Sequence, residues 1–350
     1  MLKNDFSHFK EDKITKSFGL LPNSKEVFCY SLTNKNGAEF SVISYGATIT
    51  SLKIPTSNGE KIDVVLGFED IANYVKSFHL PSAPYIGTVV GRYAGRIHKG
   101  HFVINETHFL LNKNHDENHL HGGNKGLSKV LWEAKEVSSD ENPSITLAYL
   151  SQPSDDNYPG KLYIEVTYTL TENNELVVNF TAESTEDTIV NLTQHSYFNL
   201  DGHSENVLNQ ELFVNASKIL ETTNENIPTG KFIALENHDF NFSKPKKCPD
   251  SIDTTFVLDE NDNCKASLFS PKNKLKMSVY SNQPAVHIYV GGNCFNEIKG
   301  KENANYHSQS GICFEAQNFP DAPNHGHFPS SILKKNETYS HQTTFKFENL

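Results

Sequence analysis

The chain has 350 residues, of which 37% are hydrophobic, so it can bury a large core as one all-β domain or as two ordinary domains. Its 31 Lys and Arg residues against 42 Asp and Glu residues give a formal net charge of −11. Without a basic block, this charge argues against nucleic acid or anionic membranes as partners. No apolar run approaches the length of a membrane-spanning helix.

The first 18 residues mix charged and polar side chains and lack the apolar stretch of a secretory signal. The cysteines are odd in number, far apart, and never spaced as C-x-x-C. They are Cys29, Cys248, Cys264, Cys294 and Cys313. This usage predicts reduced thiols in a cytoplasmic protein rather than a disulfide framework or a zinc knot.

Strand patterns dominate the chain. Residues 39–45, 161–170 and 175–181 alternate polar with apolar or aromatic side chains, and turn-forming residues bound each run. Short strands at regular spacing predict an antiparallel sandwich or barrel. The fold class expected is therefore all-β, built as one domain over residues 1–350.

Helical periodicity is weak, and only residues 70–74 suggest a short helix. Residues 244–253 suggest a surface loop. Large stacked sheets would offer a concave face lined by alternate side chains, which suits a carbohydrate.

Arginine is rare in this chain. Two of the 31 basic residues, Arg92 and Arg96, are arginines, which leaves 29 lysines. Arginine differs from lysine in its rigid planar fork of donors, so we expect at least one of the two to have a functional role. Chance or a structural ion pair is the alternative.

Residues 118–123 read Asn-His-Leu-His-Gly-Gly. Gly122 and Gly123 allow a sharp turn and a close approach of the backbone to a ligand, which would leave His121 at the mouth of a cleft. Taken alone, the segment is better explained as a glycine turn with a histidine facing solvent.

Residues 191–200 place Asn191, Thr193, His195 and Tyr197 on one face of a strand, by the period of two. Four polar or half-polar groups cannot all enter an apolar core without partners. This face is therefore either solvated or the wall of a polar cleft.

Residues 311–324 place Glu315 within an apolar run, on the same strand face as Cys313 and Gln317. Carboxylates among apolar neighbours are frequent proton-transfer groups, so Glu315 is a candidate general base or acid. An ordinary half-exposed strand glutamate is the alternative.

Together, these segments resemble the aldose 1-epimerase, or galactose mutarotase, family. The resemblance covers nearly the whole chain in the family's order. It is carried by residues 18–23, 45–52, 63–68, 91–97, 118–123, 129–132, 193–200, 315–322 and 328–329.

The resemblance implies a β-sandwich of the galactose mutarotase type and interconversion of the α and β anomers of a free aldose, such as galactose or glucose, without cofactor or metal. It implies a small-molecule sugar substrate, and a monomer is the default expectation for the chain. According to the resemblance, His195 donates a proton to the ring oxygen, Glu315 takes the proton of the anomeric hydroxyl, and His121 is the second histidine of the cleft. Arg96 and Asp253 bind sugar hydroxyls, and Tyr197 lies in the substrate strand.

The sequence departs from the family pattern at three positions that touch or border the sugar. Gly95 stands where asparagine is common, Thr254 where a histidine often follows the binding aspartate, and His287 where glutamine is frequent. These departures bear on substrate preference, and Gly95 and His287 remain expected substrate-binding positions. Tyr289 can stack on the sugar or belong to the core.

The residue types suit this chemistry. A cyclic hemiacetal opens when a base removes the C1 hydroxyl proton while an acid protonates the ring oxygen, with acid and base on opposite sides of the pyranose. Three alternatives stay open. They are a phosphosugar mutarotase, which needs a cluster of cations, a non-catalytic sugar-binding module, and a zinc hydrolase using His115, His119 and His121.

Overall fold

The computed structural model describes residues 14–153, 155–259, 263–292 and 297–350. Helix α1 (Ile71–Ser77) begins after Asp70, whose carboxylate accepts a hydrogen bond of 2.8 Å from the N–H of Asn73 and so caps the first turn. The short helix expected near residues 70–74 is thus confirmed. Among the described residues, no helix is long and apolar enough to cross a membrane.

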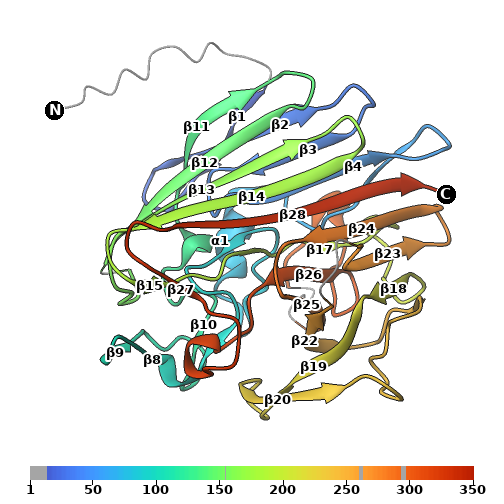
Figure 1. Cartoon of the computed structure of the whole chain (residues 1–350). Coiled ribbons are helices and arrows are strands. Elements are labelled where there is room, and N and C mark those ends of the chain that lie inside the picture. Colours follow the sequence, from blue (N-terminus) through green and yellow to red (C-terminus); the bar gives the residue numbers. More distant parts are fainter. Residues whose placement is uncertain (1–13, 154, 260–262, 293–296) are drawn as a thin grey trace.

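Three antiparallel sheets make up most of the molecule (Figure 1). The first has the strand order β1-β2-β3-β4-β5. Its strands are β1 (Thr15–Leu20), β2 (Glu26–Thr33), β3 (Glu39–Ile43), β4 (Thr48–Pro55) and β5 (Lys61–Asp63).

The second and largest sheet has nine strands, in the order β11-β12-β13-β14-β28-β24-β23-β18-β21. They are β11 (Glu133–Ser138), β12 (Ser144–Ser151), β13 (Leu162–Leu170), β14 (Glu175–Ser184), β28 (Thr338–Asn349), β24 (Leu275–Ser281), β23 (Ala266–Ser270), β18 (Glu211–Val214) and β21 (Lys246–Lys247).

The third sheet carries the candidate site and has the order β17-β26-β25-β22-β19-β20. Its strands are β17 (Tyr197–Phe198), β26 (Ile312–Gln317), β25 (Ala285–Val290), β22 (Ile252–Leu258), β19 (Ala216–Thr222) and β20 (Pro228–Ala234). Short two-stranded pairs complete the structure. They are β6 (Val89–Val90) with β16 (Thr193–Gln194), β7 (Arg96–Ile97) with β10 (His119–Leu120), β8 (His101–Ile104) with β9 (Thr107–Leu110), and β15 (Thr188–Ile189) with β27 (Ile332–Leu333).

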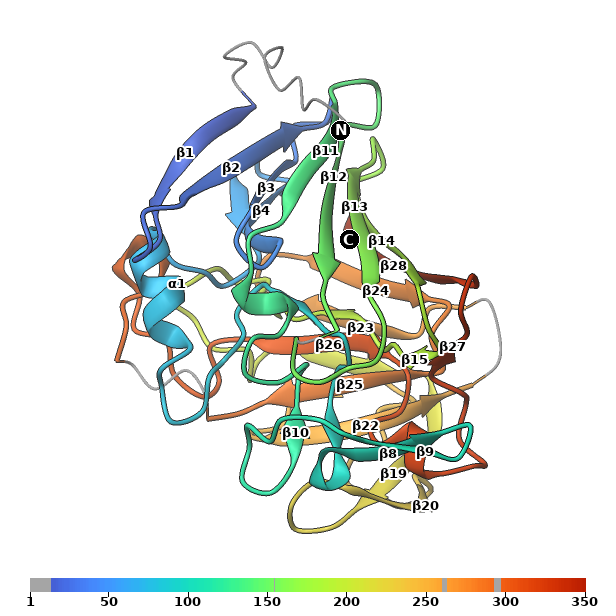
Figure 2. The ribbon, with the colours of Figure 1, turned by 90° about the vertical axis from the view of Figure 1, so that its left-hand side faces the viewer.

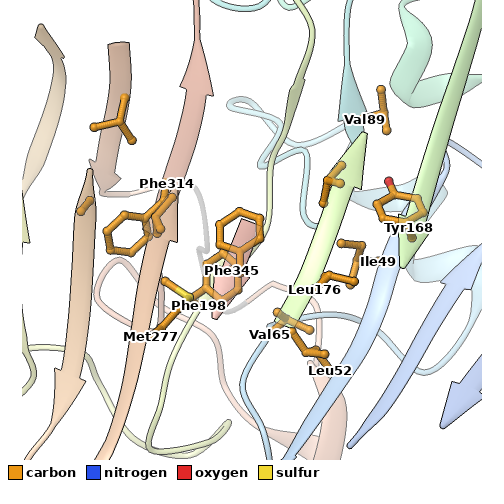
Figure 3. Close-up of a cluster of buried hydrophobic side chains, with 14 of the residues drawn as sticks. Ile49, Leu52, Val65, Val89, Tyr168, Leu176, Phe198, Met277, Phe314 and Phe345 are labelled. Carbon is orange, nitrogen blue, oxygen red and sulfur yellow. The ribbon is translucent and has the colours of Figure 1, made fainter. Parts of the chain in front are cut away.

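One hydrophobic core joins the three large sheets. Figure 2 shows β1–β4 and β11–β14 as two facing layers, and Figure 3 shows the side chains that meet between layers. Ile49 of β4 and Tyr168 of β13 belong to the same buried cluster as Phe314 of β26 and Phe345 of β28. The ring of Phe198 lies 4.9 Å from that of Phe345 and 6.2 Å from that of Phe314. The expected antiparallel β-sandwich is confirmed, and the continuous core supports the single domain, which stays a prediction.

Strand alternation decides which residues of the third sheet face this core. In β26, Ile312 and Phe314 enter the core, so Cys313, Glu315 and Gln317 lie on the opposite, outer face. The antiparallel register then brings distant residues side by side on that outer face. Glu315 pairs with His287 of β25, and His287 pairs in turn with Thr255 of β22.

Most of the strand predictions hold. The runs at 39–45, 161–170 and 175–181 correspond to β3, β13 and β14. The loop expected at residues 244–253 is interrupted by the two-residue strand β21 (Lys246–Lys247) and ends where Ile252 begins β22. Asp253 is therefore a strand residue rather than a loop residue.

The single strand expected over residues 191–200 is also wrong. Asn191 forms an isolated parallel bridge with Tyr93, and the chain then pairs with β6 through β16 and with β26 through β17. His195 lies in the gap between these two short strands, so the period of two does not run through it.

Candidate active site

A pocket of about 300 Å³ lies on the outer face of the third sheet. Its floor comes from β22, β25 and β26, which contribute Asp253, Thr255, His287, Tyr289, Glu315 and Gln317. Its walls come from the segments 78–85, 95–96, 114–129 and 222–228, and from Pro320. Seven of the eight predicted site residues line this one pocket: His195, Glu315, His121, Arg96, Gly95, Asp253 and His287.

His195 and Glu315 form the centre of the pocket. Nε2 of His195 lies 3.4 Å from Oε1 of Glu315, and both side chains are almost fully buried. The main chain holds His195 in place, because its N–H donates to the carbonyl of Thr88 and its carbonyl accepts from Gly87, each over 2.9 Å. A buried donor and a buried carboxylate in contact are the components of general acid–base catalysis.

His121 completes the polar centre as a neutral imidazole. Burial, and then the positive charges of His195 and Arg96, hold the pKa of His121 well below its usual value. The N–H of Gly95 donates to Nδ1 of His121 over 3.2 Å, so the ring proton is on Nε2. Gly95 therefore positions His121 with its main chain, where an asparagine side chain is common in the family it resembles.

The glycines after His121 do allow a close approach, but to the protein itself. A Cβ on Gly122 would lie 1.7 Å from the carbonyl oxygen of Gly91, and one on Gly123 would lie 2.3 Å from Oδ1 of Asp156. The carboxylate of Asp156 accepts hydrogen bonds from three successive N–H groups of the 124–126 loop, over 2.7, 3.0 and 3.3 Å. These contacts fix the loop that carries His121.

Polar atoms of His121, His195 and Glu315 all lie within 4.8 Å of one another, a spacing that could hold a metal ion. The hydrogen bonding argues against this use of the site. In His121, Nδ1 is occupied by Gly95 and Nε2 carries the proton, so neither nitrogen offers a lone pair to a metal. Metal-free catalysis stays a prediction.

The alternative zinc set of His115, His119 and His121 does not come together. Nδ1 of His119 lies 2.7 Å from the carbonyl oxygen of Asn112, and its Nε2 lies 2.6 Å from the hydroxyl of Tyr158. Both ring nitrogens of this buried histidine are thus used inside the protein. His115 and His121 line the pocket and His119 does not.

Two polar groups in the pocket have unsatisfied hydrogen bonds. Nε of Arg96 and Oε1 of Gln317 are buried without a hydrogen-bond partner among the described residues. A buried polar group without a partner costs about 1–3 kcal/mol, so such groups call for a ligand or an ordered water. A donor and an acceptor on the wall of one pocket suit a ligand rich in hydroxyl groups.

His287 and Asp253 form an ion pair, with Nε2 of His287 at 2.8 Å from Oδ1 of Asp253. Burial alone would lower the pKa of His287, but the hydrogen bond and charge of Asp253 outweigh it and raise that pKa above its usual value. Likewise, burial would raise the pKa of Asp253, but His287 holds it below its usual range. The second oxygen of Asp253 accepts from the side chain of Asn226 over 2.9 Å.

Tyr197 is the predicted site residue that does not line the pocket. It is buried, and its ring centre lies 5.3 Å from that of His195 and 6.2 Å from that of Tyr289. The reason is its place on β17, where it pairs with Cys313 beneath the pocket centre. Asn191 and Thr193 also serve the framework, because their side chains donate to main-chain carbonyls.

The two arginines have different environments. Arg92 is 2% exposed, and its guanidinium donates to the hydroxyl of Ser151 and to the carbonyls of residues 151, 152, 159 and 160. Arg96 lines the pocket with its Nε unpaired among the described residues. The structure therefore separates a framework arginine from a pocket arginine.

We expect Arg92→Lys to lower the free energy of unfolding by about 2–4 kcal/mol, because lysine offers three donors and leaves buried carbonyls unpaired. Chemical denaturation measures this loss, and Arg96→Lys is the matched control, with unfolding close to that of the wild type. Equal stability of Arg92→Lys and wild type would contradict the framework role.

Sequence reasoning missed several residues of the pocket. Gln317 was detectable, since it shares a strand face with Glu315, whereas Thr255 lies just beyond the loop predicted at residues 244–253 and was not singled out. Lys129 lies with its Nζ 5.3 Å from the ring centre of Phe78 and 5.9 Å from that of Tyr85. The wall at residues 78–85 has no local sequence signal of a binding site.

A buried histidine–glutamate pair at the centre of a polar pocket, on one face of an antiparallel β-sandwich, is an arrangement found in enzymes that work by proton transfer. Comparison with known proteins gives the family. The family model described as aldose 1-epimerase matches residues 29–346. The chain therefore belongs to the aldose 1-epimerase family, and it is an isomerase.

Individual relatives agree with this membership. A galactose mutarotase of Bos taurus is 38% identical over 317 residues, which are 87% of this chain and 90% of the relative. One of Mus musculus is 36% identical over 341 residues, 94% of this chain and 97% of the relative. The crystal structure of a GalM/aldose epimerase homologue from C. elegans superposes with a TM-score of 0.84 at 27% identity, covering 91% of this chain and 98% of that chain.

Proposed function

We propose that this protein interconverts the α and β anomers of free aldoses, with galactose as the first substrate to test, and that His195 and Glu315 are its acid and base. The contact of 3.4 Å between His195 Nε2 and Glu315 Oε1 carries the proposal. The ring oxygen and the anomeric hydroxyl are bonded to the same carbon, so an acid and a base that lie close together can serve both atoms, and the placement on opposite sides of the pyranose expected from the sequence is not needed.

In the proposed reaction, the carboxylate of Glu315 takes the proton of the anomeric hydroxyl while Nε2–H of His195 protonates the ring oxygen. The bond between C1 and the ring oxygen breaks and leaves an open-chain aldehyde. Rotation about the C1–C2 bond presents the other face of the carbonyl, and the reverse proton transfers close the ring. All atoms and protons balance without a cofactor.

The remaining pocket residues hold the sugar in this proposal. Arg96 Nε donates to a hydroxyl and Gln317 Oε1 accepts from one, which satisfies both buried groups. Asp253, paired with His287, binds a further hydroxyl by a charge-assisted bond. Neutral His121 donates from Nε2, and Tyr289 supplies an aromatic surface beside the ring.

The alternatives fit this pocket less well. A phosphosugar needs clustered cations, whereas the described lining offers Arg96 and Lys129 against the carboxylates of Asp253 and Glu315. In addition, Nζ of Lys129 donates a hydrogen bond of 3.1 Å to the carbonyl of Asn124. A non-catalytic binding module would not require a buried histidine–glutamate pair.

A cytoplasmic monomer without nucleic acid partners completes the proposal. Four cysteines, Cys29, Cys248, Cys264 and Cys313, form no disulfide among the described residues. Cys294 lies outside the described residues. The net charge of −11 disfavours binding to nucleic acid.

Polarimetry of freshly dissolved α-D-galactose and α-D-glucose tests the function. We expect the protein to accelerate the approach to the equilibrium rotation, with galactose at least as good a substrate as glucose. A rate equal to that of buffer for both sugars would overturn the proposal.

A pH-dependent contribution to stability follows from the raised pKa of His287. The ion pair with Asp253 stabilises the fold fully from about pH 6.5, the usual pKa of an unfolded histidine, down to the acidic range in which Asp253 takes up a proton, and this contribution is lost as the pH rises through the higher folded pKa of His287. We expect His287→Gln to lower the free energy of unfolding most on the acidic side, with the difference shrinking toward alkaline pH. Denaturant titrations at several pH values measure it, and a difference that grows with pH would contradict the ion pair.

A further inference from the structure

The hairpin formed by β19 and β20 supplies one wall of the pocket. Its two strands lie at one edge of the third sheet (Figure 1), and the turn between them places Asn226 in the pocket lining. The side chain of Asn226 donates from Nδ2 to Oδ2 of Asp253 over 2.9 Å. Neither the local sequence patterns nor the family resemblance singled out this asparagine.

The turn that carries Asn226 is held at several points. The N–H of Thr223 donates to the carbonyl of Ile227, and the N–H of Asn226 donates to the carbonyl of Thr223, each over 2.9 Å. Asn226 has a φ of 57°, in the left-handed region that asparagine tolerates better than most residues. The neighbouring Glu225 accepts a hydrogen bond of 2.9 Å from the buried side chain of Asn118, which belongs to a second wall segment. The turn is thus fixed against both the floor and another wall of the pocket.

The contact with Asp253 decides how the amide of Asn226 is oriented. A carboxylate only accepts hydrogen bonds, so the NH₂ group faces Asp253 and Oδ1 points away from it. Among the described residues, no group donates a hydrogen bond to Oδ1 of Asn226. In a residue that lines the pocket, this oxygen is available to a hydroxyl group of a ligand.

A row of neighbouring polar groups leads from the proposed base to Asn226. Glu315 pairs with His287 across the sheet. Nε2 of His287 lies 2.8 Å from one carboxylate oxygen of Asp253, and Nδ2 of Asn226 lies 2.9 Å from the other. By register, Asp253 is two strands away from Glu315 and two residues along, so their Cα atoms are roughly 12 Å apart. Hydroxyls follow one another around a pyranose in the same way. With C1 at Glu315, the far end of the row corresponds to C4, the carbon opposite C1.

We infer that Asn226 is a sugar-binding residue that sets substrate specificity, because its Oδ1 accepts a hydrogen bond from the C4 hydroxyl while Asp253 binds the C3 hydroxyl; the inference rests on the proposed function. Galactose and glucose differ in the configuration at C4. A group that bonds to this hydroxyl in one orientation loses the bond in the other, so it discriminates between the two sugars. With galactose as the first substrate of the proposal, Asn226 favours the axial hydroxyl.

Asn226→Gly tests this role, since glycine adopts the positive φ of the turn without steric cost. The dissociation constant Kd is measured by ligand-observed NMR on sugars at anomeric equilibrium. For galactose we expect Kd to rise about three- to tenfold, the scale of one lost hydrogen bond, with kcat within about twofold of wild type. The rise should be the same for 2-deoxygalactose. For 4-deoxygalactose and glucose, which lack the axial C4 hydroxyl, Kd should change by less than about twofold.

Asn105→Gly is the matched control. Asn105 lies in the turn between β8 and β9, has a φ of 49°, and donates from Nδ2 to the carboxylate of Asp187 over 2.9 Å, but it does not line the pocket. It should leave Kd unchanged for all of these sugars.

Unchanged galactose binding in Asn226→Gly with an intact unfolding transition, or an equal loss for 4-deoxygalactose, would overturn the inference. Because Kd is measured without turnover, the inference and the proposed function can fail separately. A protein that shows this binding pattern but no mutarotation would refute the proposed function and leave the role of Asn226 in place.

Discussion

Glu315→Gln and His195→Asn are each expected to lower the turnover of a free aldose by about two to four orders of magnitude, the usual contribution of one positioned proton-transfer group. Glutamine keeps the shape of Glu315 but cannot take the anomeric proton, and asparagine cannot deliver a proton to the ring oxygen. Polarimetric initial rates at saturating sugar measure the loss.

Glu183→Gln serves as the matched control, since Glu183 is an exposed strand glutamate of β14 that does not line the pocket. It should keep wild-type turnover. If Glu315→Gln or His195→Asn also keeps near wild-type turnover while its unfolding transition is intact, the pair is not the acid and base.

Arg96→Lys is expected to lower kcat/KM by about 1–3 kcal/mol, the scale of one lost charge-assisted hydrogen bond. Lysine keeps the charge but lacks the Nε–H, which in Arg96 is buried and without a partner among the described residues. Misalignment of the sugar relative to His195 and Glu315 then reduces kcat as well as binding.

Arg92→Lys is the internal comparison for this prediction. It should lower stability and leave kcat/KM of the folded protein close to wild type, because Arg92 binds main-chain carbonyls away from the pocket. Wild-type kinetics of Arg96→Lys, or a larger kinetic loss in folded Arg92→Lys, would refute the assignment of the two arginines.

Local patterns were enough to predict the regular part of the fold. β13 and β14 lie in a sheet with one face on the core, so their sequences alternate and are easily detected. The segment around His195 could not be predicted in this way, because within a few residues the chain stops pairing with β6 and begins to pair with β26. The alternation of polar and apolar side chains along a strand gives no information about such a change of pairing partner.

The candidate site could not be predicted from local patterns, because it is formed by residues that are distant in the sequence. His195 and Glu315 are 120 positions apart by their numbering, and no local pattern says that they touch; the family resemblance alone joined them. The contacts behind the site could be predicted neither from local sequence patterns nor from the family resemblance. The bond of Gly95 to His121 uses the main chain, and the contact of Cys313 with His195 depends on the register between β17 and β26.

The most direct test of the central claim is exchange NMR on an equilibrium mixture of α- and β-D-galactose with chelator-treated protein. We expect exchange between the two anomeric protons well above the spontaneous rate, with no new sugar signals, and near-spontaneous exchange with Glu315→Gln. Exchange no faster than in buffer, or exchange that appears only when a metal ion is added back, would contradict metal-free anomer interconversion by His195 and Glu315.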